Sequence, residues 1–207
     1  MGTLKNAFEH FKTIVNHKRW VFHYARLAGI PIRGLLHDLS KFGPSEFLYN
    51  VKYYKPGVSP VTVAKEINGY SDAWFHHKSH NKHHYEYWMD RFDDGCYVAR
   101  IPFIYSLEMI CDYLGAAQAY NPKSKESVYK RECEWWESQK YNRAMHPDNI
   151  EFVTWVFKEL KYCEDNKEAK IILNKRHLKV RYNNIVANSK YDTEVQIGNR
   201  IYYGRKQ

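Results

Sequence analysis

The stretch Leu35-Leu36-His37-Asp38-Leu39-Ser40-Lys41-Phe42 decides how the rest of the sequence is interpreted. Two apolar residues lead into an adjacent histidine and aspartate, and a lysine follows three residues after the aspartate. At the end of an apolar helix such a pair can share one metal ion, because imidazole suits zinc, iron and nickel, and carboxylate suits magnesium and manganese. One dipeptide is weak evidence, so this interpretation depends on whether other segments supply further ligands.

Histidines are concentrated in one later segment. Five of the eleven lie within nine residues, namely His76, His77, His80, His83 and His84. A lone buried histidine is usually satisfied by hydrogen bonds, but five imidazoles this close together would crowd one another. The cluster therefore favours metal ligation. A polar, partly protonated surface patch and an adventitious, tag-like metal site are the alternatives.

Asp112 is the most informative carboxylate, because it lies in Glu108-Met109-Ile110-Cys111-Asp112-Tyr113, within the most apolar helical segment of the chain. A carboxylate buried without a partner costs several kcal/mol or takes up a proton, and coordination to a metal removes that cost. The alternative is an exposed edge of the helix on which Glu108 and Asp112 lie one turn apart.

The composition indicates a globular protein of 207 residues, either one domain or one domain with an appendage. The aromatic fraction is high at 16%, and 18 tyrosines and six tryptophans suggest half-buried aromatic surfaces. Such a chain is long enough to bury a sizeable core.

Cysteine usage and hydropathy predict a cytoplasmic protein. None of the four cysteines forms a C-x-x-C pair or has zinc-finger spacing, which predicts reduced thiols. The N-terminus lacks the apolar region of a signal peptide, and no run of about 18 apolar residues predicts a membrane span.

Apolar periodicity and breakers such as Gly29-Ile30-Pro31 predict an all-α fold that ends in a small C-terminal β-hairpin. The hairpin is predicted where Glu194–Ile197 and Arg200–Tyr203 flank Gly198-Asn199. Helices are predicted at 3–28, 31–40, 44–54, 61–78, 83–91, 102–120, 125–140, 148–163 and 167–180.

Charge divides the chain into a body at 1–165 and a basic appendage at 166–207. Residues 167–207 hold ten basic and three acidic residues, a net charge of +7 out of +9 for the whole chain. This segment can bind nucleic acid or steer a phosphorylated ligand, or it is a solvated, solubilising face.

The order His…His-Asp…His…His…Asp resembles the HD-domain superfamily of metal-dependent phosphohydrolases. His83-His84, Val98-Ala99-Arg100-Ile101-Pro102 and Asp112 resemble elements of its cyclic-dinucleotide phosphodiesterase branch. The segments 37–42, 73–77 and 81–88 are also similar to a small family of bacterial and phage proteins of unknown function. The resemblance covers about residues 10–120 and implies an HD-domain helical bundle for the body.

The resemblance also implies one or two divalent ions, of manganese, iron, cobalt, nickel, zinc or magnesium. The implied ligands are His17, His37, Asp38, His77, His84 and Asp112. His83 is an alternative to His84, and His23 is a less well placed alternative to His17. This sequence has Lys41 where the nucleotidase branch often has glutamate, and it lacks the glycine-tyrosine-proline element of the cyclic-dinucleotide branch.

The implied function is hydrolysis of a nucleotide or another small phosphoester by metal-activated water, with Asp38 and Lys41 as catalytic residues. His80, Asn81, His83 and Lys41 are the predicted substrate-binding residues. Lys41 is otherwise a plain surface lysine. Trp74, Tyr85, Tyr87 and Trp88 either stack on a base or belong to the core.

Other functions fit the same residues. The alternatives are a nuclease that holds DNA or RNA through the basic segment, a di-iron oxygenase, and a metal-stabilised nucleotide-binding protein without turnover. A small phosphorylated substrate is the expected partner, and the sequence leaves an oligomer open.

Overall fold

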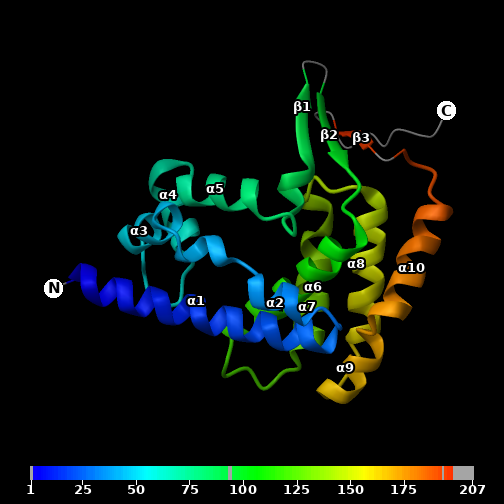
Figure 1. Ribbon diagram of the computed structural model, residues 1–207, viewed down its shortest axis with the longest axis horizontal. Helices are drawn as coiled ribbons and strands as arrows, with labels where there is room; N and C mark the ends of the chain where they lie inside the picture. The colour runs from blue at the N-terminus through cyan, green and yellow to red at the C-terminus, as the bar shows by residue number, and fades with distance from the viewer. Residues whose placement is uncertain (1, 93–94, 193, 198–207) are drawn as a thin grey trace.

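A computed structural model describes residues 2–92, 95–192 and 194–197, which are mostly helical (Figure 1). Ten α-helices are present in these residues. They are α1 (Gly2–Leu27), α2 (Pro31–Leu36), α3 (Pro44–Lys52), α4 (Pro60–Asn68), α5 (Asp72–His80), α6 (Phe103–Tyr120), α7 (Val128–Gln139), α8 (Pro147–Leu160), α9 (Asn166–Ile172) and α10 (Lys175–Ala187). Short 3-10 helices cover Leu39–Phe42, Tyr85–Trp88 and Lys140–Asn142. The predicted helical fold is confirmed in this general form.

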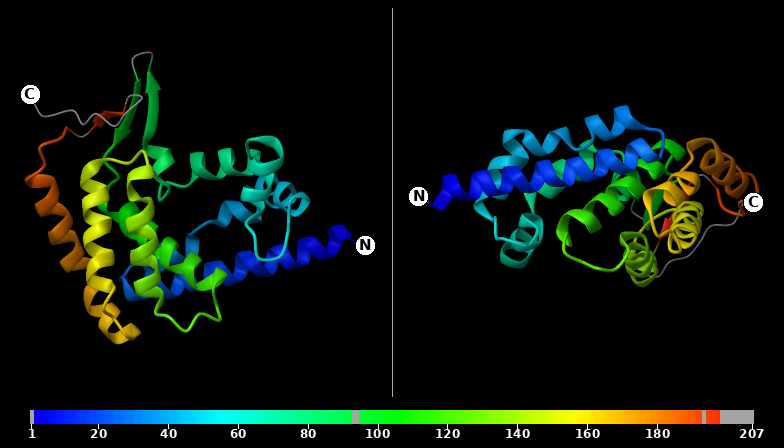
Figure 2. Two further views of the ribbon diagram at one scale, coloured as in Figure 1. Left: turned by 180° about the vertical axis from the view of Figure 1, so that it is seen from behind. Right: turned by 90° about the horizontal axis from the view of Figure 1, so that it is seen from below.

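The long helix α1 runs along one side of the molecule and organises the rest (Figure 1). It ends where Gly29 adopts a left-handed conformation with φ of +71°, and Pro31 begins α2. Helix α6 packs along α1, while α3, α4 and α5 lie toward the N-terminal end of α1 and α7 to α10 toward its C-terminal end (Figures 1 and 2).

Two glycines allow close helix packing against α1. A β-carbon at Gly115 of α6 would lie 2.9 Å from the backbone nitrogen of Val21, and one at Gly34 of α2 would lie 2.4 Å from Cβ of Ala25. Real β-carbons almost never come this close, so the two glycines set the distances of α6 and α2 from α1.

Replacing Gly115 by alanine is therefore expected to lower the free energy of unfolding by about 2 kcal/mol, because the added methyl group must push α1 away from α6. Urea unfolding measures the change. Alanine is favoured over glycine in a helix by about 1 kcal/mol, so an alanine variant more stable than the wild type would show that the two helices separate without cost.

The described β-structure is a three-stranded antiparallel sheet, and it corrects two predictions. β1 (Met89–Phe92) and β2 (Gly95–Ala99) form a hairpin where a helix over 83–91 was expected. The small hairpin is thus at 89–99 and not at the C-terminus. β3 (Glu194–Ile197) is a strand, but it pairs with β2, where Val98 faces Val195. Its predicted partner, Arg200–Tyr203, lies outside the described residues.

Capping residues explain why two of the predicted helices are each divided in two. Within 61–78, Gly69 at φ +81° ends α4, and the Ser71 hydroxyl then caps α5 by accepting a hydrogen bond from the Trp74 N–H. Within 167–180, the Asn174 side chain caps α10 in the same way. The predicted 31–40 helix ends at Leu36, which leaves the His-Asp pair just outside it.

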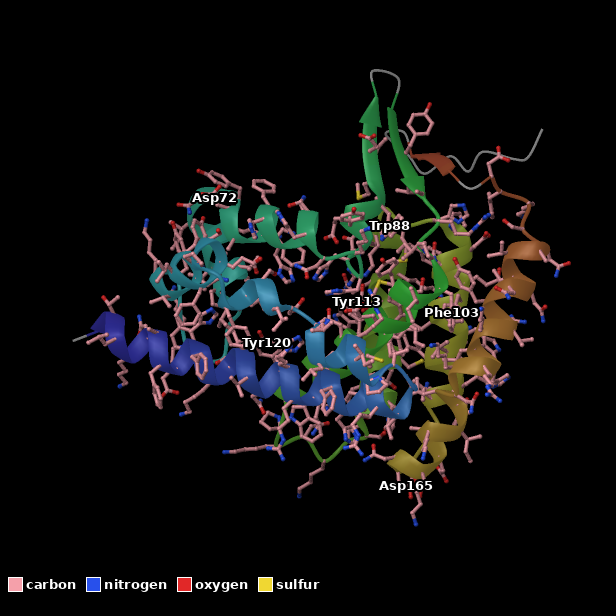
Figure 3. All side chains as sticks on the ribbon, viewed as in Figure 1. Asp72, Trp88, Phe103, Tyr113, Tyr120 and Asp165 are labelled. Carbon is pink, nitrogen blue, oxygen red and sulfur yellow. The ribbon has the colours of Figure 1, made fainter. Side chains whose placement is uncertain are left out.

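One buried apolar cluster joins α1 and α6 to α7 through α10, and partly buried aromatic side chains such as Phe103 and Tyr113 pack against it (Figure 3). Leu173 and Leu178, from the basic appendage, belong to this cluster. The boundary at residue 165 stays a prediction. No helix among the described residues has the length and apolar character needed to cross a membrane.

Candidate metal centre

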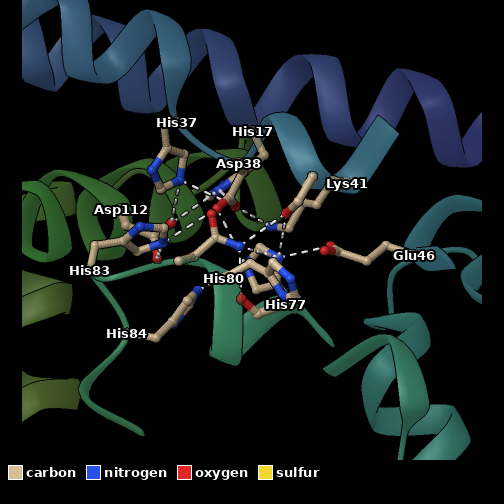
Figure 4. Close-up of polar contacts among 12 residues, drawn as sticks. His17, His37, Asp38, Lys41, Glu46, His77, His80, His83, His84 and Asp112 are labelled. Carbon is tan, nitrogen blue, oxygen red and sulfur yellow. Dashed lines mark hydrogen bonds and ion pairs between the residues drawn. The ribbon is translucent and has the colours of Figure 1, made fainter. Parts of the chain in front are cut away.

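The His37-Asp38 pair sits in a sharp turn after α2. Asp38 has a left-handed backbone, with φ of +52°, which is uncommon for a residue other than glycine. The Lys18 ammonium group of α1 donates hydrogen bonds of 2.6 Å to the carbonyl oxygens of Leu35 and His37 and so holds the turn in place. As a result both side chains of the pair point into the same buried centre (Figure 4).

A first set of donor atoms gathers around one oxygen of Asp38 and one of Asp112. His17 Nε2 lies 3.0 Å from Asp112 Oδ1 and 3.8 Å from Asp38 Oδ2. His37 Nε2 lies 3.2 Å from Asp38 Oδ2 and 3.3 Å from Asp112 Oδ1. These four residues come from α1, the turn after α2, and α6, and all are buried.

A second set gathers around the other oxygen of Asp38. Both His77 Nε2 and His83 Nε2 lie 3.3 Å from Asp38 Oδ1, and His84 Nε2 lies 2.8 Å from His77 Nε2. The second set therefore contains Asp38, His77, His83 and His84, and it shares Asp38 with the first set. His83, predicted to bind substrate, is thus a candidate ligand alongside His84.

These separations fit metal coordination. Ligands about 2.1 Å from one ion lie roughly 3.0 Å apart at right angles and roughly 3.4 Å apart in a tetrahedron. Among the described residues, the Nε2 atoms of His17, His37 and His83 and both Asp38 oxygens have no partner with good hydrogen-bond geometry. Their contacts are ion pairs with one another and, for Asp38 Oδ2, with the Lys41 ammonium group at 2.6 Å. Buried polar atoms are normally satisfied by hydrogen bonds, and a metal ion would satisfy a converging group of this kind. The residues present fit a transition-metal ion.

Two glutamates that the sequence analysis did not single out as site residues orient these imidazoles. Glu46 Oε2 of α3 lies 2.8 Å from His77 Nδ1, and Glu108 Oε1 of α6 lies 3.3 Å from His37 Nδ1. Arg33 holds Glu108 in turn through a 2.7 Å hydrogen bond. A carboxylate on Nδ1 fixes the tautomer that presents Nε2 to a metal. The sequence could have indicated Glu108, because it lies one helical turn before Asp112. No sequence pattern indicated Glu46.

Electrostatics keep the central carboxylates ionised. Burial alone would raise the pKa of the Asp38 carboxyl, but the charges of His37 and Lys41 hold that pKa well below its usual range. Burial acts upward on the Asp112 pKa too, and contacts from His17 and His37 bring it well below its usual range. Both side chains are therefore available as anionic ligands at neutral pH.

The histidines of the centre differ in protonation. Burial lowers the pKa of His17, and burial followed by the charge of His83 lowers the pKa of His84 well below its ordinary value. Burial acts downward on His37 as well, but the Asp38 charge and hydrogen bonds to Asp112, Asp38 and Glu108 together outweigh it and raise the His37 pKa well above its ordinary value. An ion that binds here must therefore displace a proton from His37.

The other predicted site residues surround this centre. The Lys41 ammonium nitrogen lies 2.6 Å from Asp38 Oδ2. Asn81 Nδ2 donates to Ser40 Oγ and to the His77 carbonyl oxygen, while His80 is exposed and stacks on His76. His23, the alternative first ligand, contacts Trp20 and belongs to none of the donor sets in the described residues.

A cavity of about 290 Å³ adjoins the centre and is lined by His17, Lys41, Glu46 and His77, among others. Of the aromatic residues near the histidine cluster, Trp74 lines this cavity. Tyr85 and Trp88 pack against the apolar core, and Tyr87 is partly exposed. Only Trp74 of the four is therefore placed beside both the cavity and the histidines.

The basic residues of α9 and α10 lie away from the centre. Helix α10 packs on α8 at the edge of the molecule opposite α3 and α4 (Figures 1 and 2). Asp165 marks the start of α9 at an outer corner (Figure 3).

The chain belongs to a protein family of unknown function (DUF5662), which it matches over residues 6–159. No curated protein and no solved structure gives a match. The matched range contains all the residues of both donor sets and ends within α8. The family match makes no assignment to the HD superfamily, which stays a resemblance.

Proposed function

We propose that this member of the family is a metal-dependent phosphohydrolase for a small phosphoester, with a nucleotide as the first candidate substrate. One observation carries the proposal: each oxygen of Asp38 belongs to a different buried donor set, and Lys41 lies beside the same carboxylate at the wall of a cavity. Two adjacent ions, a nearby cation and a cavity are the components that phosphoester hydrolysis uses.

The donors suggest which ions bind. Histidine nitrogens outnumber carboxylate oxygens in the second set, and imidazole favours zinc, iron, nickel and related ions over magnesium. Such an ion lowers the pKa of bound water and supplies hydroxide near neutral pH.

Residues of this chain would do the remaining work. Asp38, His17 and His77 hold and orient the centre from three different elements. The Lys41 ammonium group, whose pKa the neighbouring Asp38 charge raises against the opposing effect of burial, stays protonated and can bind phosphoryl oxygens. The water oxygen forms a bond to phosphorus, the ester P–O bond breaks, and the leaving oxygen takes up the proton that the water releases.

The cavity and the surface charge favour a small substrate over nucleic acid. A cavity of about 290 Å³ is at the lower end of the range for small-molecule sites. The basic helices that would hold a phosphate backbone lie at the opposite edge of the molecule, where no donor set was found among the described residues.

The test uses protein purified without a histidine tag and loaded separately with manganese, iron, cobalt or zinc. It is assayed against phosphomonoesters, phosphodiesters and nucleotides for release of phosphate, pyrophosphate or nucleoside. We expect hydrolysis with at least one metal, and a loss of at least about tenfold in Lys41→Met, which keeps every metal donor. Oxygen consumption by the iron form, or tight binding without product, would overturn the proposal in favour of an oxygenase or a binding protein.

A further inference from the structure

The cavity extends away from the metal centre along α1. His17 lies at the metal centre, and His10 lines the same cavity two helical turns earlier, about 10.5 Å along the axis. Helix α3 also runs along the cavity away from the metal centre. Glu46 lies beside the centre, and Asn50 lines the cavity one helical turn further from it. The cavity therefore has a metal end and a remote end formed by His10 and Asn50.

The remote end holds unsatisfied polar atoms. His10 is only 5% exposed, and neither ring nitrogen has a hydrogen-bond partner among the described residues. Asn50 is 7% exposed, and its Oδ1 is also without a partner there. The rings of Phe47 and Tyr54 lie 5.3 and 5.9 Å from the His10 ring and enclose it on other sides. Polar atoms left unpaired in such a place are unfavourable unless a bound group satisfies them.

The chemistry of this end is neutral. Burial, followed by the charge of Lys41, lowers the pKa of His10 to about 4. The imidazole is then uncharged at pH 7 and offers one N–H donor and one nitrogen acceptor, and the Asn50 oxygen in the lining of the same cavity is a further acceptor. At the metal end, by contrast, Lys41 and the ions favour an anion. The other walls of the cavity are mostly apolar, with Ile14, Pro60, Val61, Ala73 and Trp74, and they also include Ser59 and Lys65. The Lys65 ammonium nitrogen lies 5.1 Å from the centre of the Trp74 ring.

We propose that His10 and Asn50 form a recognition subsite for an uncharged group of the substrate that has both a hydrogen-bond donor and an acceptor, such as the edge of a nucleobase. This inference rests on the proposed function for the position of the phosphate. The substrate is then a monoester with its phosphate at the metal end, an apolar or aromatic middle beside Trp74, and a neutral polar edge at the remote end.

Binding measurements test the subsite without requiring turnover. The probes are the common nucleoside monophosphates and ribose 5-phosphate, which keeps the sugar and phosphate and lacks the base. We expect the wild type to bind at least one nucleotide about 100-fold more tightly than ribose 5-phosphate, because buried polar groups strongly reject a ligand that leaves them unpaired. His10→Phe and Asn50→Leu should each reduce that ratio to below about tenfold, with unchanged metal content and unchanged affinity for inorganic phosphate.

Thr13→Val is the matched control, because Thr13 lines the same cavity but its hydroxyl already donates to the Glu9 carbonyl oxygen. This variant should keep the full ratio. A second readout needs no ligand: the two apolar variants should melt at or above the wild-type temperature, since each removes an unsatisfied buried polar group.

The inference and the proposed function can fail separately. The subsite is overturned, even if hydrolysis is observed, when the wild type binds nucleotides and ribose 5-phosphate equally. It is also overturned when both apolar variants keep the wild-type ratio of nucleotide affinity to ribose 5-phosphate affinity. Discrimination that both variants abolish supports the subsite even if no probe is hydrolysed. Destabilisation of both variants with no change in the binding ratio would assign His10 and Asn50 to folding alone.

Discussion

If the proposed function is right, an Asp38→Asn variant is expected to bind neither of the two proposed metal ions and to hydrolyse phosphoesters at least about 10³-fold more slowly than the wild type. Both donor sets depend on this carboxylate, with His77 and His83 around Oδ1 and His37 around Oδ2. Elemental analysis of tag-free protein measures the metal content, which should fall from about two ions per chain to well below one.

Asparagine is the informative replacement at position 38. It has nearly the size of aspartate and tolerates the left-handed backbone found there, so a loss of metal reports the charge rather than a broken turn. His84→Ala is the comparison, because His84 belongs to the second set only, and about one ion should remain. Wild-type metal content in Asp38→Asn would contradict a centre built on this carboxylate.

A Glu132→Gln variant is expected to be more stable than the wild type above neutral pH, by roughly 3 to 5 kcal/mol at pH 9. Glu132 is buried in α7, and its burial, reinforced by the charge of Asp112, raises its pKa from the ordinary 4.5 to about 8. Between these two values the unfolded chain releases its proton and the folded protein keeps it. Unfolding is therefore increasingly favoured as pH rises from about 4.5 to 8.

Glutamine stays neutral in both states and removes this dependence. Urea unfolding of the two proteins at pH 5, 7 and 9 should give a stability difference that is small at pH 5 and grows toward pH 9. Glu134→Gln, at an exposed position of the same helix, should change stability by less than about 0.5 kcal/mol at each pH. A Glu132→Gln difference that is the same at all three pH values would contradict the raised pKa.

Residue type and order along the sequence predicted which helices would meet at the centre. His17, the His37-Asp38 pair and Asp112 are separated by long stretches, yet the structure brings their donor atoms within a few ångströms. Such a prediction is possible because a buried carboxylate such as Asp112 needs a partner, and few residue types can supply one. Whether a metal binds there stays a prediction.

Residues that act on a metal ligand or line the remote end of the cavity could not be predicted from the sequence in this way. Glu46 contacts His77 only because α3 packs against α5, which is a tertiary contact. His10 and Asn50 likewise look like ordinary polar residues of amphipathic helices. Their lack of partners is visible only when the cavity between α1 and α3 is known.

The sheet shows how tertiary pairing overrides local pattern. Met89–Phe92 has a composition that suits either a helix or a strand, and pairing with Gly95–Ala99 decides for the strand. β2 then presents a free edge, and Glu194–Ile197 pairs with that edge. The sequence pattern of a short strand does not show whether the strand pairs with the next segment of the chain or with a distant one.

Helix α1 carries His17 at one end of the cavity and His10 at the other on a single uninterrupted helix. Each residue inserted between them would rotate His10 by about 100° and move it out of the cavity, whereas a full turn would keep its direction and add about 5.4 Å. If His10 binds the substrate as proposed, helix α1 fixes the distance between the group bound at His10 and the phosphate at the metal centre. The distance between His10 and His17 can then increase only by whole helical turns if both side chains are to face the cavity. Smaller differences in substrate size would have to be accommodated by the other residues that line the cavity.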